Sequence, residues 1–134
     1  MKAAGILETV LYSGDLEAMR DFYANVLGLD LVAADMKSHV FFRCGAQMLL
    51  IFDPRRTKRQ TGEISPPPHG TEGEGHVCFS APGDELDDWK RHLGAHATPI
   101  ESELAWPRGG RSIYFRDPAG NSVEIAEPRI WGLA

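Results

Sequence analysis

The clearest hydrophobic pattern in the chain predicts a β-hairpin near its C-terminal end. Polar and apolar side chains alternate over 112–116 and again over 122–126. Between these ranges the chain reads Asp-Pro-Ala-Gly, which is typical of a type I turn followed by a left-handed glycine. Such a turn predicts that Asp117 pairs with Asn121.

This register divides the predicted hairpin into an apolar face and a polar face, because strand side chains alternate between faces. It places Tyr114 opposite Glu124. The polar face carries Ser112, Tyr114, Arg116, Ser122 and Glu124. A carboxylate among hydroxyls and a guanidinium would suit the lining of a pocket, but a solvated sheet face would have the same pattern.

The first half of the chain has the pattern of strand, helix and three strands. The expected elements are a strand over 6–12, a helix between the N-cap Asp15 and the stop Gly28, a strand over 29–34, and a hairpin of 39–44 with 47–52.

The second half repeats this order. The expected elements are a strand over 74–80, a helix from about 86 that ends at Gly94, a weak strand over 98–103, and the closing hairpin. The connection over 53–75 has no predicted regular structure. It carries Arg55, Arg56, Lys58 and Arg59, a cluster that would attract an anionic substrate or would simply be solvated.

The repeat predicts an α+β fold of two βαβββ modules in a single domain, residues 1–134. Module 1 covers about 5–53, the connection 54–73, and module 2 about 74–128. Two curved modules can form a cup-shaped, partly open barrel with the helices outside. The opening strands carry Glu8 and His76 at matching places, and Leu50 falls where Glu124 stands in the other module.

Composition excludes several classes of partner. The 134-residue chain has a formal net charge of -5, which argues against nucleic acid. No stretch approaches the roughly 20 apolar residues of a membrane helix, and the N-terminal stretch does not resemble a signal peptide. We read Cys44 and Cys78 as reduced thiols, and we expect a cytoplasmic protein.

The faces bearing Glu8, His76 and Glu124 would point into the cup, and their side chains have metal-ligand chemistry. Nitrogen and oxygen donors without thiolate suit Mn²⁺, Fe²⁺, Co²⁺, Ni²⁺ or Zn²⁺. Three protein ligands would leave positions open for water or a small-molecule substrate.

Other residues are candidates for roles around such an ion. We take Glu124 and Tyr114 as the candidate catalytic pair, with Tyr114 orienting the carboxylate or a substrate, although a plain cross-strand contact is an equal alternative. The candidates for binding a substrate carboxylate or phosphate are Arg43, Arg108, Arg111 and Arg116. Each of these arginines could instead be an ordinary surface or strand-pairing residue.

Four segments, 8–16, 21–29, 75–79 and 117–124, resemble the vicinal oxygen chelate superfamily, which includes glyoxalase I, bleomycin and fosfomycin resistance proteins, and extradiol dioxygenases. The resemblance implies paired βαβββ modules, a homodimer, and a metal held by His76, Glu124 and Glu8, the last where metal-binding members usually have His. Leu50 stands where glyoxalase I has a further carboxylate, which argues against that enzyme.

Two functions therefore stay open. One is a divalent-metal-dependent enzyme acting on a small oxygenated substrate by lyase, isomerase, thiol transferase or dioxygenase chemistry. The other is a metal-free binding protein of the bleomycin-resistance kind, which would sequester a small molecule or antibiotic.

Overall fold

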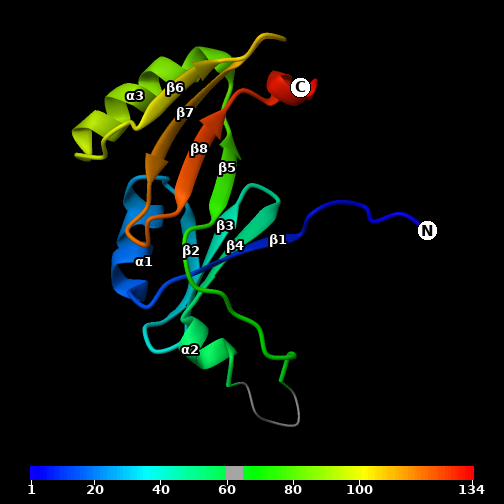
Figure 1. Ribbon diagram of the computed structural model, residues 1–134, viewed down its shortest axis with the longest axis vertical. Coiled ribbons are helices and arrows are strands. Elements are labelled where there is room, and N and C mark those ends of the chain that lie inside the picture. The colour runs from blue at the N-terminus through cyan, green and yellow to red at the C-terminus, as the bar shows by residue number, and fades with distance from the viewer. Residues whose placement is uncertain (60–64) are drawn as a thin grey trace. The chain divides into compact units, whose positions relative to one another are not determined.

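The computed structural model describes residues 1–59 and 65–134, and the contacts divide the chain into two compact units, Met1–Gly73 and Glu74–Ala134 (Figure 1). In the described part of the chain, every helix is too short or too polar to cross a membrane.

The first unit is a four-stranded sheet with one long helix. Its elements are β1 (Glu8–Tyr12), α1 (Leu16–Asn25), β2 (Asp30–Asp35), β3 (His39–Cys44), β4 (Gln47–Phe52) and the short helix α2 (Pro54–Thr57). The strand order is β1-β4-β3-β2, with β1 parallel to β4 and the other pairs antiparallel.

The second unit repeats this topology. Its elements are β5 (His76–Ser80), the 3₁₀ turn η1 (Gly83–Glu85), α3 (Leu86–Ala95), β6 (Ser102–Ala105), β7 (Arg111–Arg116), β8 (Ser122–Ala126) and the 3₁₀ turn η2 (Pro128–Trp131). The order β5-β8-β7-β6 matches that of the first sheet, so the predicted α+β fold with two βαβββ modules is confirmed.

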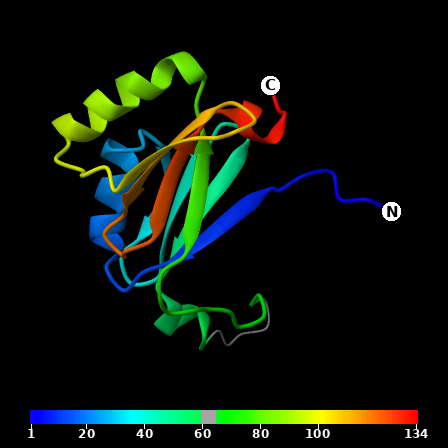
Figure 2. The ribbon, with the colours of Figure 1, turned by 45° about the horizontal axis from the view of Figure 1, so that its top comes forward.

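Each unit has its own core between the helix and one face of the sheet. Helix α1 contacts β2, β3 and β4, whereas α3 contacts β7 (Figure 2). The largest side chains of the two cores are fully buried, namely Met19, Tyr23, Phe42, Leu49 and Ile51 in the first unit, and Leu86, Leu93, Ile113, Phe115 and Ile125 in the second. Burial of such a side chain contributes about 1.5–3 kcal/mol to stability, so these side chains determine which face of each sheet packs against its helix.

Local signals placed α1 and the closing hairpin correctly. The Asp15 carboxylate accepts a hydrogen bond from the Ala18 amide and caps α1. In the hairpin, the Asp117 amide donates to the Asn121 carbonyl at 3.2 Å, and Gly120 has a φ of 83°. Tyr114 lies opposite Glu124, so the predicted register is confirmed.

Two predicted boundaries in other places were wrong. Helix α3 continues through Gly94 to Ala95, and the left-handed residue that follows it is Ala97, with a φ of 50°. The last strand before the closing hairpin lies at Ser102–Ala105, because its position is decided by pairing with β7 and not by its own weak pattern.

The connection between the modules is also more regular than predicted. Asp53 caps α2 by accepting from the Arg55 amide at 2.9 Å, and Pro54 occupies the first turn, where its missing N–H is harmless. The part of the predicted connection over 60–64 lies outside the described residues.

Candidate functional site

Glu124 lies in the middle of β8, between Cys78 on β5 and Tyr114 on β7. Strand alternation turns it away from the apolar core face, yet only 6% of the residue is exposed. A buried carboxylate is costly unless its oxygens find donors or cations, so the partners of Glu124 define the chemistry of this place.

One oxygen of Glu124 has a neutral donor. The Tyr114 hydroxyl donates to Glu124 Oε1 at 2.9 Å. Burial raises the pKa of Tyr114, and the hydrogen bond to the Glu124 carboxylate raises it further. Tyr114 is therefore a protonated donor at neutral pH, and it orients the carboxylate from the adjacent strand.

The other oxygen faces an imidazole. His76 Nε2 lies 3.3 Å from Glu124 Oε2, and His76 Nδ1 lies 3.0 Å from the Ser122 carbonyl oxygen. Because a carbonyl oxygen only accepts, Nδ1 must carry the hydrogen. In the neutral ring, Nε2 would then present a lone pair toward a carboxylate oxygen, which is unfavourable. The contact becomes favourable when a cation lies between the two atoms, either a proton on Nε2 or a metal ion.

Cys78 completes the immediate surroundings of Glu124. Desolvation of its thiol, with the Glu124 carboxylate beside it, raises the pKa of Cys78 to about 12 although part of the residue reaches solvent. The group is therefore a thiol at neutral pH and not a thiolate.

The predicted equivalences between the modules are confirmed by the strand registers. Glu8 lies opposite Met48 just as His76 lies opposite Ser122. Leu50, between Val10 and Phe41, takes the place of Glu124. Glu8 is exposed and belongs to the first unit, whereas His76 and Glu124 belong to the second.

His76 Nε2 and the Glu124 carboxylate are two adjacent donors of the kinds that borderline divalent ions accept. Within either unit, the described residues form no group of three or more His, Cys, Asp or Glu side chains that could hold a metal ion. The second unit therefore supplies two of the three predicted ligands.

The four candidate substrate arginines occupy different environments. Arg116 lies on the same sheet face as Glu124 and contacts Glu101 at 2.7 Å. Arg111 lies on the opposite face, where it contacts Asp87 at 3.2 Å. Arg43 is exposed on β3, and Arg108 is exposed in the loop before β7.

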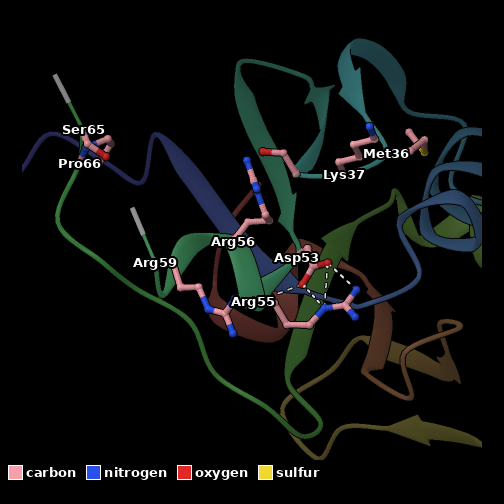
Figure 3. A pocket seen from close by; sticks show the side chains of 9 residues that line it. Met36, Lys37, Asp53, Arg55, Arg56, Arg59, Ser65 and Pro66 are labelled. Atoms are coloured by element: carbon pink, nitrogen blue, oxygen red, sulfur yellow. Dashed lines mark hydrogen bonds and ion pairs between the residues drawn. The ribbon is translucent and has the colours of Figure 1, made fainter. Parts of the chain in front are cut away.

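The three arginines of the basic cluster in the connection line a separate pocket of about 800 Å³ in the first unit (Figure 3). Its lining includes Lys37, Asp53, Arg55, Arg56 and Arg59. The Arg55 guanidinium folds back onto the Asp53 carboxylate at 2.6 Å, as the dashed lines in Figure 3 show. Part of the cluster is therefore structural, and the rest gives the pocket a positive charge.

Two contributors to the site were missed in the sequence. The Ser122 carbonyl, which orients His76, is a backbone group, and its role follows only from the pairing of β5 with β8. Cys78 is two residues from His76 on β5 and shares a strand face with it, but its contact with Glu124 again depends on that pairing.

Comparisons with known proteins agree with this architecture. The model of the Glyoxalase/Bleomycin resistance protein/Dioxygenase superfamily matches residues 5–125. Biphenyl-2,3-diol 1,2-dioxygenase 3 of Rhodococcus globerulus is 30% identical over 126 residues, which cover 87% of this chain and 59% of that protein. The chain therefore spans under two thirds of the length of this relative.

Solved structures are similar over nearly the whole chain. The crystal structure of a lactoylglutathione lyase from Agrobacterium tumefaciens has a TM-score of 0.95 and 45% identity, with 99% of this chain and 100% of the other covered. A glyoxalase/bleomycin resistance protein/dioxygenase from Nocardioides has a TM-score of 0.74 and 26% identity, with 95% and 85% covered. The chain belongs to the Glyoxalase/Bleomycin resistance protein/Dioxygenase superfamily.

Proposed function

We propose that this protein is a divalent-metal-dependent enzyme acting on a small oxygenated substrate, with His76, Glu124 and Glu8 as the metal ligands. The observation that carries the proposal is the orientation of His76. Its Nδ1 is hydrogen-bonded to the Ser122 carbonyl, and its Nε2 faces Glu124 Oε2, 3.3 Å away.

This arrangement fits a metal ion on chemical grounds. Metal-binding histidines commonly donate their second ring N–H to a carbonyl or carboxylate, which fixes the tautomer and the ring orientation. Tyr114 acts in the same way on the carboxylate, because its hydroxyl holds Glu124 Oε1 at 2.9 Å. Glu8 is the third proposed ligand because its register position matches that of His76.

A bound divalent ion would supply Lewis acidity toward a substrate oxygen. The side chains of the chain have simpler roles. Glu124 is the group placed to accept a proton from the substrate, and Tyr114 keeps that carboxylate in one orientation. The raised pKa of Tyr114 keeps its hydroxyl protonated, so it remains a donor at neutral pH.

The names of two relatives suggest the substrate class. A lactoyl group and a biphenyl-2,3-diol both carry oxygen atoms on neighbouring carbons. We therefore propose a substrate that presents two such oxygens. The lyase relative favours a thioester-forming or thioester-cleaving reaction, whereas Leu50 in the first unit argues against glyoxalase I. The assay therefore includes a substrate for the lyase reaction and a substrate for the dioxygenase reaction.

The test is metal analysis of protein purified without chelator, followed by assays with S-lactoylglutathione and biphenyl-2,3-diol. We expect about one divalent ion per chain, and a loss of metal affinity and turnover of at least about 100-fold in His76→Ala. His96→Ala is the matched control, because His96 is an exposed imidazole on the C-terminal end of α3, and it should retain both properties.

Metal-free protein that binds ligands equally well before and after chelator treatment would contradict the proposal. That result would instead favour the binding-protein function of the bleomycin-resistance kind. Equal metal content in His76→Ala and His96→Ala would also contradict the assignment of His76, whatever the activity.

A further inference from the structure

A second pocket in the second unit, of about 620 Å³, lies between the loop before β7 and the turn η2 after β8. Figures 1 and 2 both show these two segments side by side at the C-terminal end of the chain. The lining consists of two indoles, a proline, an isoleucine, two arginines and a glycine, namely Trp106, Pro107, Arg108, Arg129, Ile130, Trp131 and Gly132.

The walls of this pocket are held by specific packing. A side chain at Gly110 would come within 2.5 Å of Ile130, and Gly110 has a φ of 93°, so this position suits only glycine. The Trp106 amide donates to the Gly110 carbonyl at 2.9 Å and closes the loop. The loop and η2 therefore form a defined pocket and not merely two neighbouring surface segments.

One wall connects the pocket to the candidate catalytic face. The Trp106 indole N–H donates to Ser112 Oγ at 2.8 Å, and Ser112 is fully buried. Ser112 lies two residues before Tyr114 on β7, and both side chains are on the face that carries Glu124. Two residues of a strand span about 7 Å, so the residue that Trp106 contacts lies about that far along β7 from Tyr114.

The chemistry of the lining selects a ligand. Trp131 is 79% exposed and Trp106 is 38% exposed, and such indole surfaces favour stacking with another aromatic ring. Arg129 is already ion-paired with Glu127, so Arg108, in the exposed loop, is the guanidinium left to bind an anion. The volume is that of an ordinary small-molecule site.

We infer that this pocket binds a flat aromatic ring bearing a carboxylate, through Trp106, Trp131 and Arg108. We further infer that it is the subsite for an aryl carboxylate part of the substrate, a step that rests on the proposed function. Binding of the aryl carboxylate itself does not depend on a metal ion.

The chain provides a direct readout, because two of its three tryptophans line the pocket and Trp89 lies on α3. The probe is p-toluate, monitored by quenching of intrinsic fluorescence and by calorimetry. Two further probes separate the contributions: p-toluamide has the ring without the charge, and cyclohexanecarboxylate has the charge without the aromatic ring.

We expect p-toluate to bind most tightly of the three. Trp131→Ala should weaken its binding about 10-fold, and Trp89→Phe should leave it unchanged. Arg108→Gln should weaken p-toluate about 10-fold and leave p-toluamide unaffected, whereas Arg91→Gln, an exposed arginine of α3, should affect neither probe. Trp131 and Arg108 are exposed, so these variants should remain folded.

Calorimetry with His76→Ala separates this inference from the proposed function. If His76→Ala still binds p-toluate, the binding pocket is supported whether or not a metal site exists. If p-toluate competitively inhibits turnover by the wild-type protein, the inference that the pocket is a substrate subsite is supported. Equal affinity of wild type and Trp131→Ala would overturn the binding site. Binding without inhibition would overturn the subsite, and a Trp131→Ala effect on oligomeric state alone would identify the surface as a subunit contact instead.

Discussion

The two units have the same strand order and equivalent registers, but the sheet faces that lie away from their helices differ in chemistry. In the first unit the central row of this face is Val10, Leu50 and Phe41. In the second unit the same row is Cys78, Glu124 and Tyr114. The same scaffold thus carries an apolar row in one unit and a polar row in the other.

Part of the rest of the first face is aromatic. The Tyr12 hydroxyl and His69 Nδ1 are 2.7 Å apart, and the His69 ring lies edge-on to Phe52, with centroids 5.2 Å apart. Flat aromatic side chains of this kind suit stacking contacts, whereas His76 and Glu124 suit polar chemistry. The duplicated module has therefore kept its fold and diverged in the side chains of one face.

Both units also share a short sequence motif after the last strand. Each last strand is followed by an acidic residue, a proline and an arginine, in the first unit from Asp53 and in the second from Glu127. Both carboxylates are buried, and both are paired with the arginine two residues later. This repeated motif ends the sheet and starts the helical turn that follows it.

The largest effect should come from the cores, where the units are alike. Phe42 and Phe115 occupy equivalent, fully buried positions on β3 and β7. We expect Phe42→Ala and Phe115→Ala each to lower the free energy of unfolding by about 3–5 kcal/mol, measured by chemical denaturation. Leu31→Ala, at a half-exposed position of β2, is the control and should change it far less. A cost below about 1 kcal/mol for either phenylalanine would show that the two cores are not equivalent.

A smaller effect should separate the two faces. Tyr114→Phe makes the second face resemble the first, and it removes the donor to Glu124 Oε1 while leaving the ring in place. We expect a loss of metal affinity of about 10–100-fold, measured by competition with a chelator. Phe41→Tyr is the matched change in the first unit, where the facing residue is Leu50. It should alter the metal affinity less than about 2-fold, as expected for a change outside the metal site. Equal effects of the two variants would contradict the proposed role of Tyr114 in holding Glu124.

The smallest effect concerns the shared acidic motif and its pH dependence. The Arg55 guanidinium lowers the pKa of Asp53, and Arg129 followed by Arg111 lowers the pKa of Glu127. A carboxyl whose pKa is lowered by folding stabilises the native state above its unfolded pKa, about 3.9 for Asp and 4.3 for Glu, and this stability is lost as the pH falls through the folded pKa.

Neutral variants should therefore be less stable at pH 7 and less sensitive to acid. We expect Asp53→Asn and Glu127→Gln each to lower the free energy of unfolding at neutral pH by about 1 kcal/mol, because the arginine partners are largely in solvent. The loss should be greater for Glu127, which has two arginine partners. Denaturation curves at neutral pH and near pH 3 measure this difference. If the free energy of unfolding of a variant changes with pH as much as that of wild type, the carboxylate removed in that variant has no such role.

Sequence reasoning found the features that depend on neighbouring residues. The cap at Asp15 and the turn at Asp117 are local, so their residue types were enough to place α1 and the register that sets Tyr114 opposite Glu124. The internal repeat was visible for the same reason. It led to the correct equivalence of Leu50 with Glu124 before any strand pairing was known.

Features that depend on distant partners were not found in this way. The end of α3 beyond Gly94 and the position of β6 are decided by packing and by pairing with β7, which outweigh weak local preferences. The pairing of β5 with β8 brings His76 to Glu124 across 48 positions of sequence, and it selects the ring nitrogen that faces the carboxylate. The sequence by itself thus determined the module, its repeat and the candidate residues, because turns and caps are short-range. Only the tertiary structure decided the orientation of those residues, because hydrogen bonds between distant strands set it.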